Sequence, residues 1–321
     1  MKNISIYDFD KNTHIYKNGR SSLYICLKSI LKNYNAKQIL LPVVICDEII
    51  PVIKKFNIEI VFYNLTDNLE IDFDKLEEKL ENKKSILLAV NFFGLKNNWK
   101  KINDLKNVYD IVTIEDSAHC HVSENEHADF SFFSLRKIYP LLSGSMLKIN
   151  NSKYNRPFTY RTSLPNIEEV SYFLRNYIRL KATYSKIKNK NTAIFNSKDI
   201  FIDCFSKYLI KGVLKDDKKY QEIRLNNYNY WLNYLPEKEL TPIFKNINDR
   251  DFYPYVYPCI ASSRDYSEKW IRWGIEKNIT VMSWPKFPSI IHEDMLTDAH
   301  KNILCFPVNQ QMSVAEFLKY E

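Results

Sequence analysis

Short apolar runs alternate with amphipathic stretches along the first 150 residues of the chain. The runs are apolar throughout, as in strands that are buried on both faces of a sheet, and the stretches between them have helical spacing. The predicted strands are 38–44, 58–65, 85–94, 109–116, 128–135 and 145–150. The predicted helices are 20–33, 46–56, 71–82 and 99–107. This alternation predicts an α/β fold with a mainly parallel sheet and helices on both of its faces.

The pattern changes beyond residue 150. Long, basic, tyrosine-rich helical segments occupy about 150–235, whereas the remainder mixes strands with one clear helix over 265–278. We therefore expect a large domain over 1–235, which includes the basic helical segment, and a small α+β C-terminal domain over 236–321.

Composition places the chain among folded proteins. Of its 321 residues, 45% are hydrophobic and 14% aromatic, which is enough to bury a sizeable core. No apolar run reaches the roughly 18 residues of a spanning helix, and the start of the chain lacks the apolar core of a signal peptide. The six cysteines form no C-x-x-C pair, so reduced thiols are expected rather than disulfides or a zinc ribbon. These features predict a cytoplasmic protein.

The net charge of +8 is concentrated in one segment. Residues 171–220 contain twelve Lys/Arg and four Asp/Glu, which leaves the rest of the chain close to neutral. Such a distribution argues against a nucleic-acid-binding face spread over the whole protein. The basic segment could contact an anionic membrane or a partner, but a solvated helix face is the more common reason for such a run, so membrane contact is not expected.

Residues 113–137 contain half of the six histidines, together with an acidic pair and a lysine. Zinc needs three or four nitrogen, sulfur or oxygen ligands, and this stretch offers Asp116, His119, Cys120, His121 and His127. On an extended segment, however, His119 and His121 point to one side while Cys120 points away. No second ligand cluster occurs elsewhere, so no metal ligand is assigned, although a metal-binding protein stays an alternative, as does a polar loop without function.

Asp116, His119 and Lys137 fit a different chemistry. Asp116 ends a predicted strand, and Lys137 follows the next one, so both belong at the carboxyl edge where ligands bind to parallel sheets. A carboxylate beside a protonated pyridine nitrogen and a lysine that forms a Schiff base are what pyridoxal 5′-phosphate requires. Its phosphate would bind at a helix N-terminus, which the stretch Asn18-Gly19-Arg20-Ser21-Ser22 provides ahead of the first predicted helix.

The motifs stand in the order seen in a known family. They are NGRSSL (18–23), LPVVICDEI (41–49), NFFG (91–94), EDSAH (115–119), DFSFFSLRK (129–137), Arg264-Asp265, Gly274-Ile275, Trp284-Pro285 and LCFPVN (304–309). In these motifs the chain resembles the DegT/DnrJ/EryC1/StrS family of fold type I sugar aminotransferases. The resemblance covers about three quarters of the chain, and four of its five glycines fall on family positions.

The resemblance implies a role for each candidate residue. Lys137 would form the Schiff base with pyridoxal phosphate and later carry the transferred proton. Asp116 would pair with the ring nitrogen, and His119 would lie near the ring hydroxyl. Gly19, Arg20 and Ser21 would hold the phosphate together with Ser134. It also implies an amino donor such as glutamate, a keto-sugar acceptor linked to a nucleotide or otherwise activated, and a homodimer with shared active sites.

Several positions depart from the family pattern. The phosphate loop begins at residue 18, so the family's N-terminal arm is expected to be missing or replaced. Cys46 stands where an aromatic residue often covers the cofactor, and Ser145 replaces the second glycine after the lysine. TYRTS (159–163) matches only loosely the stretch that reaches into a neighbouring subunit. A non-catalytic relative, acting as a regulator or a partner subunit, therefore stays an alternative to the enzyme, as does another reaction of the same cofactor.

Overall fold

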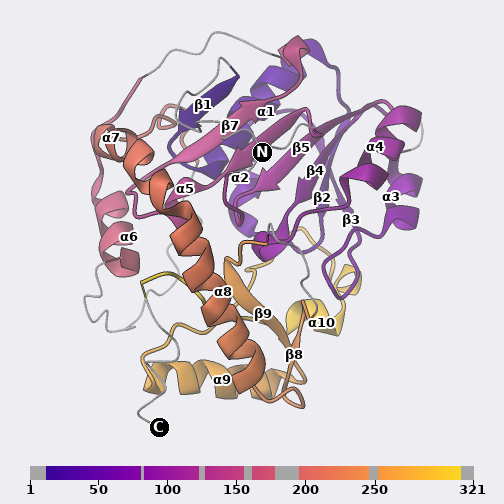
Figure 1. The fold of residues 1–321 in the computed structure, drawn as a ribbon. Helices are drawn as coiled ribbons and strands as arrows, with labels where there is room; N and C mark the ends of the chain where they lie inside the picture. Colours follow the sequence, from indigo (N-terminus) through magenta and orange to yellow (C-terminus); the bar gives the residue numbers. More distant parts are fainter. Residues whose placement is uncertain are drawn as a thin grey trace.

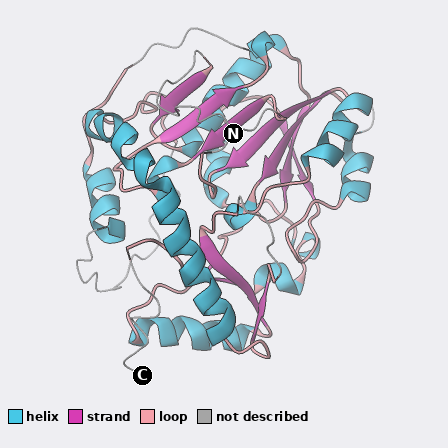
Figure 2. Ribbon diagram, in the orientation of Figure 1, coloured by secondary structure: helices cyan, strands magenta, loops and turns pink. Residues whose placement is uncertain are grey.

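The computed structural model describes residues 12–80, 83–122, 127–154, 161–177, 195–245 and 252–311. Its elements form a seven-stranded sheet and a separate four-stranded sheet, with helices packed around them (Figures 1 and 2). None of the described helices is long and apolar enough to cross a membrane. The arrangement is that of a mixed α/β protein, as the sequence predicts.

The large sheet has the strand order β1-β7-β6-β5-β4-β2-β3. Its strands are β1 (Thr13–Tyr16), β2 (Gln38–Pro42), β3 (Glu59–Tyr63), β4 (Ser85–Val90), β5 (Ile111–Ser117), β6 (Phe130–Phe133) and β7 (Ser145–Ile149). All pairs from β3 to β6 are parallel, whereas β7 pairs antiparallel with both β6 and β1. The prediction of a mainly parallel sheet is confirmed. The edge strand β1 was not predicted, because four residues are too short for a clear period.

The predicted helices of the large domain are present with one exception. They are α1 (Gly19–Asn33), α3 (Phe73–Leu80) and α4 (Trp99–Val108), whereas the exception, 46–56, contains only the short helix α2 (Ile50–Ile53). The prediction of one helix over 46–56 was wrong, because that segment contains the 3₁₀ turn Asp47–Ile49 followed by the four-residue helix α2. Pro51 lies at the start of α2, where its missing N–H costs nothing, but it prevents one continuous helix over the whole segment.

The 3₁₀ turn Ser152–Tyr154 follows β7. The residues that the structure describes after it form the helices α6 (Ile167–Tyr177), α7 (Cys204–Val213) and α8 (Asp217–Tyr234), with the 3₁₀ turn Leu214–Asp216 before α8. Part of the basic segment, 178–194, lies outside the described residues. In Figure 1, α8 runs from the large sheet down to the C-terminal part of the chain. The basic segment 171–220 reaches only the first residues of α8, and the later part of this helix buries Arg224, Tyr228 and Trp231.

The second sheet is antiparallel and has the order β10-β11-β9-β8. Its strands are β8 (Leu240–Pro242), β9 (Val256–Ala261), β10 (Met282–Ser283) and β11 (Ile303–Pro307). The helices α9 (Arg264–Glu276) and α10 (Asp298–Lys301), with the 3₁₀ turn Glu293–Met295, complete this α+β part. It begins after the end of α8, close to the predicted boundary at 235/236, and the division into domains stays a prediction.

Candidate active site

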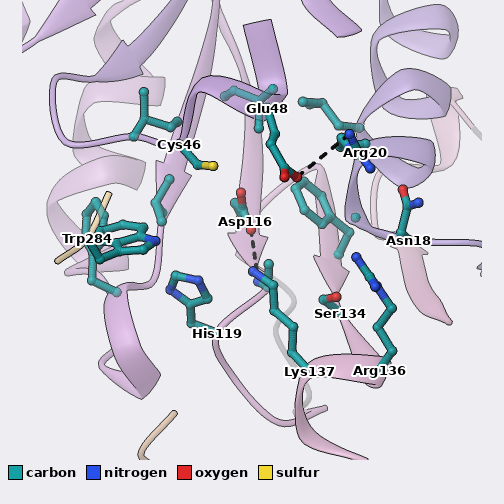
Figure 3. Close-up of a pocket in the computed structure, with 18 of the residues that line it drawn as sticks. Asn18, Arg20, Cys46, Glu48, Asp116, His119, Ser134, Arg136, Lys137 and Trp284 are labelled. Atoms are coloured by element: carbon teal, nitrogen blue, oxygen red, sulfur yellow. Dashed lines mark hydrogen bonds and ion pairs between the residues drawn. The ribbon is translucent and has the colours of Figure 1, made fainter. Parts of the chain in front are cut away.

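A pocket opens at the carboxyl ends of β4, β5 and β6, beside the N-terminus of α1. About 730 Å³ of empty space lies within it, including space that is open to solvent. Polar and aromatic side chains from both parts of the chain line it: Asn18, Arg20, Cys46, Glu48, Phe92, Asp116, His119, Phe132, Ser134, Arg136, Lys137 and Trp284. In Figure 3, Lys137 and Asp116 lie centrally, with Asn18, Arg20, Ser134 and Arg136 on one side and Cys46, His119 and Trp284 on the other.

Lys137 is carried by the short helix α5 (Leu135–Ile138), which directly follows β6 and Ser134. The backbone N–H of Lys137 donates to the carbonyl of Ser134 at 3.1 Å. Its Nζ lies 5.6 Å from the ring centroid of Tyr255, a residue that precedes β9 in the C-terminal part. The amine is therefore placed inside the pocket and next to an aromatic face.

Asp116 lies near the end of β5 and is 9% exposed. The backbone N–H of Ala118 donates to its Oδ1 at 2.9 Å. Burial raises the pKa of Asp116 to about 6, although this N–H and the charge of Lys137 both oppose the rise. A buried carboxylate of this kind favours a cationic ligand group, which would stabilise its ionised form.

His119 is buried between two aromatic rings. Its imidazole stacks on Phe93, with centroids 5.5 Å apart, and on Tyr255, with centroids 4.6 Å apart, while Trp284 meets it edge-on at 5.4 Å. Burial lowers the pKa of His119 well below its ordinary value, and the charge of Lys137 acts in the same direction. Its Nδ1 is buried without a hydrogen-bond partner among the described residues. The imidazole of His119 is therefore neutral, and the residue lines the pocket beside Trp284.

The opposite end of the pocket is suited to an anion. The first turn of α1 faces it, with Asn18 as the N-cap, and Arg20 and Arg136 contribute two guanidinium groups. Arg20 Nη1 lies 3.8 Å from Glu48 Oε2 at the wall of the pocket. Exposed backbone N–H groups at a helix N-terminus together with arginines are a typical phosphate site.

Six of the seven predicted site residues line this pocket: Gly19, Arg20, Asp116, His119, Ser134 and Lys137. Ser21 lies behind it, fully buried, and its backbone N–H and hydroxyl both donate to Asn18 Oδ1, at 3.1 and 3.2 Å. Ser21 was expected to help hold a phosphate. In the structure its backbone N–H and hydroxyl are instead bonded to the N-cap residue Asn18.

The sequence prediction missed several lining residues. Phe92, Glu48 and Trp284 were not assigned to the site, and neither was Phe93, which packs behind His119. The absence of an aromatic residue at Cys46 was one available signal, because it implied that another ring covers the ligand. Trp284 stands in the motif Trp284-Pro285 and is such a ring, 4.9 Å from Phe93.

His121 and His127 do not join His119. His121 Nδ1 lies 3.3 Å from Asp217 Oδ2, and its ring stacks on Tyr253 at 4.7 Å, away from the pocket-lining set. His127 is exposed. Over the described part of the chain, no three His, Cys, Asp or Glu side chains gather closely enough to hold a metal ion.

The pocket fits pyridoxal phosphate group by group. The amine of Lys137 can meet the aldehyde, the buried carboxylate of Asp116 can meet the ring nitrogen, and the imidazole of His119 can lie beside the ring hydroxyl. The phosphate fits at the first turn of α1, near Arg20.

Comparison with known proteins gives an independent result. Residues 16–156 match the model of the DegT/DnrJ/EryC1/StrS aminotransferase family. No curated protein matches the chain by sequence. Among solved structures, the apo form of a putative sugar aminotransferase, Spr1654 from Streptococcus pneumoniae, has a TM-score of 0.71 at 13% identity, covering 95% of this chain and 83% of that one.

Other solved structures have the same fold. A DegT DnrJ EryC1 StrS aminotransferase from Brucella abortus has a TM-score of 0.67 at 14% identity, covering 95% of this chain and 83% of that one. NtdA from Bacillus subtilis, solved with the cofactor PMP, has a TM-score of 0.68 at 14% identity, covering 95% and 70%. The segment that matches the DegT/DnrJ/EryC1/StrS aminotransferase family, residues 16–156, contains Lys137, Asp116 and the start of α1.

Proposed function

We propose that the protein is a pyridoxal-phosphate-dependent aminotransferase which moves an amino group from an amino acid, with glutamate the expected donor, to a keto group of a nucleotide-linked or otherwise activated sugar. The pathway that fits this chemistry is the biosynthesis of a surface polysaccharide or a secondary metabolite. The observation that carries the proposal is that Lys137 and Asp116, from two adjacent strand ends, line one pocket.

When bound, pyridoxal phosphate supplies an electron sink for the bond changes at the donor's α-carbon. Lys137 provides the primary amine inside the pocket, and its Nζ can accept a proton at one position and release it at the next. Asp116 is kept from water and becomes fully ionised when a cationic ring nitrogen lies beside it, because each charge stabilises the other.

The other polar side chains lie at the two ends of the pocket and would orient the bound groups. His119 is held between Phe93 and Tyr255, so its imidazole keeps one orientation at the pocket and would lie beside a bound ring hydroxyl. At the other end, Arg20 and Arg136 neutralise a phosphate or a substrate carboxylate. These side chains orient the reacting atoms and do not themselves react.

A homodimer with shared active sites is part of the proposal. Four large apolar side chains are exposed at the start of α6 and along α7, namely Leu164, Ile167, Phe205 and Tyr208. The two segments are adjacent, because Ser163 forms a bridge with Asp203. An exposed apolar patch of this kind supports a contact with a second copy. The stretch 159–163, compared above with the family's subunit-crossing segment, lies partly outside the described residues.

The test is the absorbance of the purified protein with pyridoxal phosphate. The wild-type protein should develop the visible band of a lysine-bound cofactor, and Lys137→Ala should lack it. Lys100→Ala, which removes an exposed lysine of α4, should keep the band. Adding glutamate should bleach the band, and a keto-sugar nucleotide should restore it. A wild-type protein without the band would refute the proposal, and a band that no amino acid bleaches would favour the non-catalytic relative.

A further inference from the structure

The helix that carries Lys137 is held at its C-terminal end by side chains from distant parts of the chain. Gln310, which follows β11, donates from Nε2 to the carbonyl of Ile138 at 2.6 Å. The hydroxyl of Tyr139 donates to Oδ1 of Asp217, the first residue of α8, at 2.5 Å. A helix of four residues leaves most of its carbonyl groups without partners of its own, so these contacts decide how it is oriented.

Arg224 in turn holds Gln310. Its side chain projects from α8, is 1% exposed and donates from Nε to Gln310 Oε1 at 2.9 Å. Its Nη1 donates to the carbonyls of Pro254 and Tyr255, at 3.1 and 3.2 Å. One guanidinium therefore joins α8 to the segment that enters β9 and to the segment that leaves β11.

The acceptors of Arg224 named above are all neutral, and the nearby ring of Tyr253, 5.8 Å away, is neutral as well. Taking a guanidinium out of water is costly, and bonds to amide oxygens recover less than a carboxylate partner would. A buried, uncharged residue of similar size would pack here at lower cost. The choice of arginine thus points to a requirement other than stability.

The contacts of Arg224 converge on the pocket from two directions. Through Gln310 it reaches the last carbonyl of the helix that carries Lys137. Through the carbonyl of Tyr255 it reaches the ring that stacks on His119 and lies 5.6 Å from Lys137 Nζ. The same guanidinium consequently sets the position of the lysine and of the aromatic stack relative to each other.

We propose that Arg224 and Gln310 are positioning residues which hold Lys137 where its amine can bond to the cofactor. This rests on the proposed function. In that step a C=N bond forms between Nζ and the aldehyde carbon, and the oxygen leaves as water, so no oxidant or reductant is needed. Misplacing the lysine should weaken this bond while leaving the rest of the pocket able to bind.

The experiment compares pyridoxal phosphate with pyridoxamine phosphate, which has an amine in place of the aldehyde and makes no bond to Lys137. Gln310→Ala and Arg224→Met should weaken binding of pyridoxal phosphate by about tenfold, the size expected for loss of one charge-assisted hydrogen bond. Binding of pyridoxamine phosphate should stay within about twofold of the wild-type value, because it makes no bond to Lys137. A twofold change in affinity corresponds to roughly 0.4 kcal/mol. The fraction of pyridoxal phosphate that borohydride fixes covalently to Lys137 should fall in both variants.

Two further variants complete the design. Tyr228→Phe removes another α8 hydrogen bond, from the Tyr228 hydroxyl to the carbonyl of Phe244, and should leave both affinities unchanged. Arg224→Lys keeps the charge and one donor and should restore part of the covalent fraction, and Gln310→Ala provides the same test if Arg224→Met does not fold.

Equal loss of both affinities, or no change in either, would overturn the proposal. If the wild-type protein fixes no cofactor at all, the proposed function fails, and this proposal fails with it.

Discussion

The buried carboxylate of Asp116 should make the cofactor-free protein less stable as the pH rises. In the unfolded chain this carboxyl ionises near its ordinary pKa of 3.8, whereas in the folded protein burial raises the pKa to about 6. Between these two values the folded state keeps a proton that the unfolded state has released. Stability therefore falls as the pH increases through this range, and the full cost, about 3 kcal/mol, is present above it.

Asp116→Asn removes the charge but keeps the shape, and its amide oxygen can still accept the N–H of Ala118. We expect the cofactor-free variant to be more stable than the wild-type protein by up to about 3 kcal/mol near pH 7.5, and about equally stable near pH 4. Urea unfolding at both pH values measures this. Asp104→Asn, an exposed carboxylate on α4, is the control and should change stability by no more than about 0.5 kcal/mol at either pH.

Cofactor binding should reverse the order of stability. The wild-type protein gains an ion pair between Asp116 and the ring nitrogen, which the asparagine cannot form, so saturating pyridoxal phosphate should stabilise the wild type more than the variant. If the stability difference between the two cofactor-free proteins does not change with pH, burial does not penalise the carboxylate, and this reasoning is wrong. The variant would then inform only on binding.

Two other predictions follow from the backbone and from the pocket wall. Gly94→Ala should cost about 4 kcal/mol in urea unfolding, because φ is +106° and the added Cβ would lie 2.1 Å from the carbonyl oxygen of Tyr253. Gly212→Ala, with nothing within 4 Å of its added Cβ, should instead stabilise the folded protein by about 0.5 kcal/mol. Similar changes in unfolding free energy at both sites would contradict the close approach of the Tyr253 carbonyl to Gly94. Pyridoxal phosphate should protect the pocket-lining Cys46 from iodoacetamide but leave the exposed Cys204 reactive, as peptide mapping would reveal. Equal labelling of Cys46 with and without the cofactor would place the ligand elsewhere.

The parallel sheet could be predicted because its strands are apolar on both faces. β2, β4 and β5 are buried at every position, and this burial is visible in the sequence as the apolar runs ILL in β2 and ILLAV in β4. The polar residues that end such runs are then few, which is why Asp116 and Lys137 could be assigned to one site. The antiparallel edge strand β1 and the interrupted segment around Pro51 gave no comparable signal.

The aromatic enclosure of His119 could not be predicted in the same way. Phe93 lies on a turn with φ of +54°, Tyr255 precedes β9, and Trp284 follows β10, so the three rings come from separate parts of the chain. Aromatic residues are common throughout this sequence, which contains 22 Tyr and 19 Phe. A ring that packs on a histidine is therefore indistinguishable, from sequence, from one that fills the core.

Helix α8 illustrates a further limit on what a hydrophobic pattern reveals. Its buried face includes Arg224, Asn227, Tyr228 and Trp231, each of which donates to a carbonyl oxygen outside the helix. Polar side chains are read as solvent-facing by any periodicity argument, so a helix that binds through hydrogen bonds to distant backbone is taken for a surface helix. Recognising it requires the acceptors, and these belong to segments that only the fold brings together.

The residues that carry the proposed chemistry and those that position them thus differ in how far apart they lie along the chain. Asp116, His119 and Lys137 fall within 113–137, because one strand, one connection and a second strand suffice to bring them to the same edge of the sheet. Gln310 reaches the helix of Lys137 across a separation of 172 positions, and Arg224 reaches Gln310 across 86. A local motif can therefore persist in a chain whose long-range supports have changed. The reaction of Lys137 with a cofactor depends on the local motif and on the long-range contacts that hold its helix. The affinities of the Arg224 and Gln310 variants for pyridoxal phosphate and pyridoxamine phosphate test the second of these.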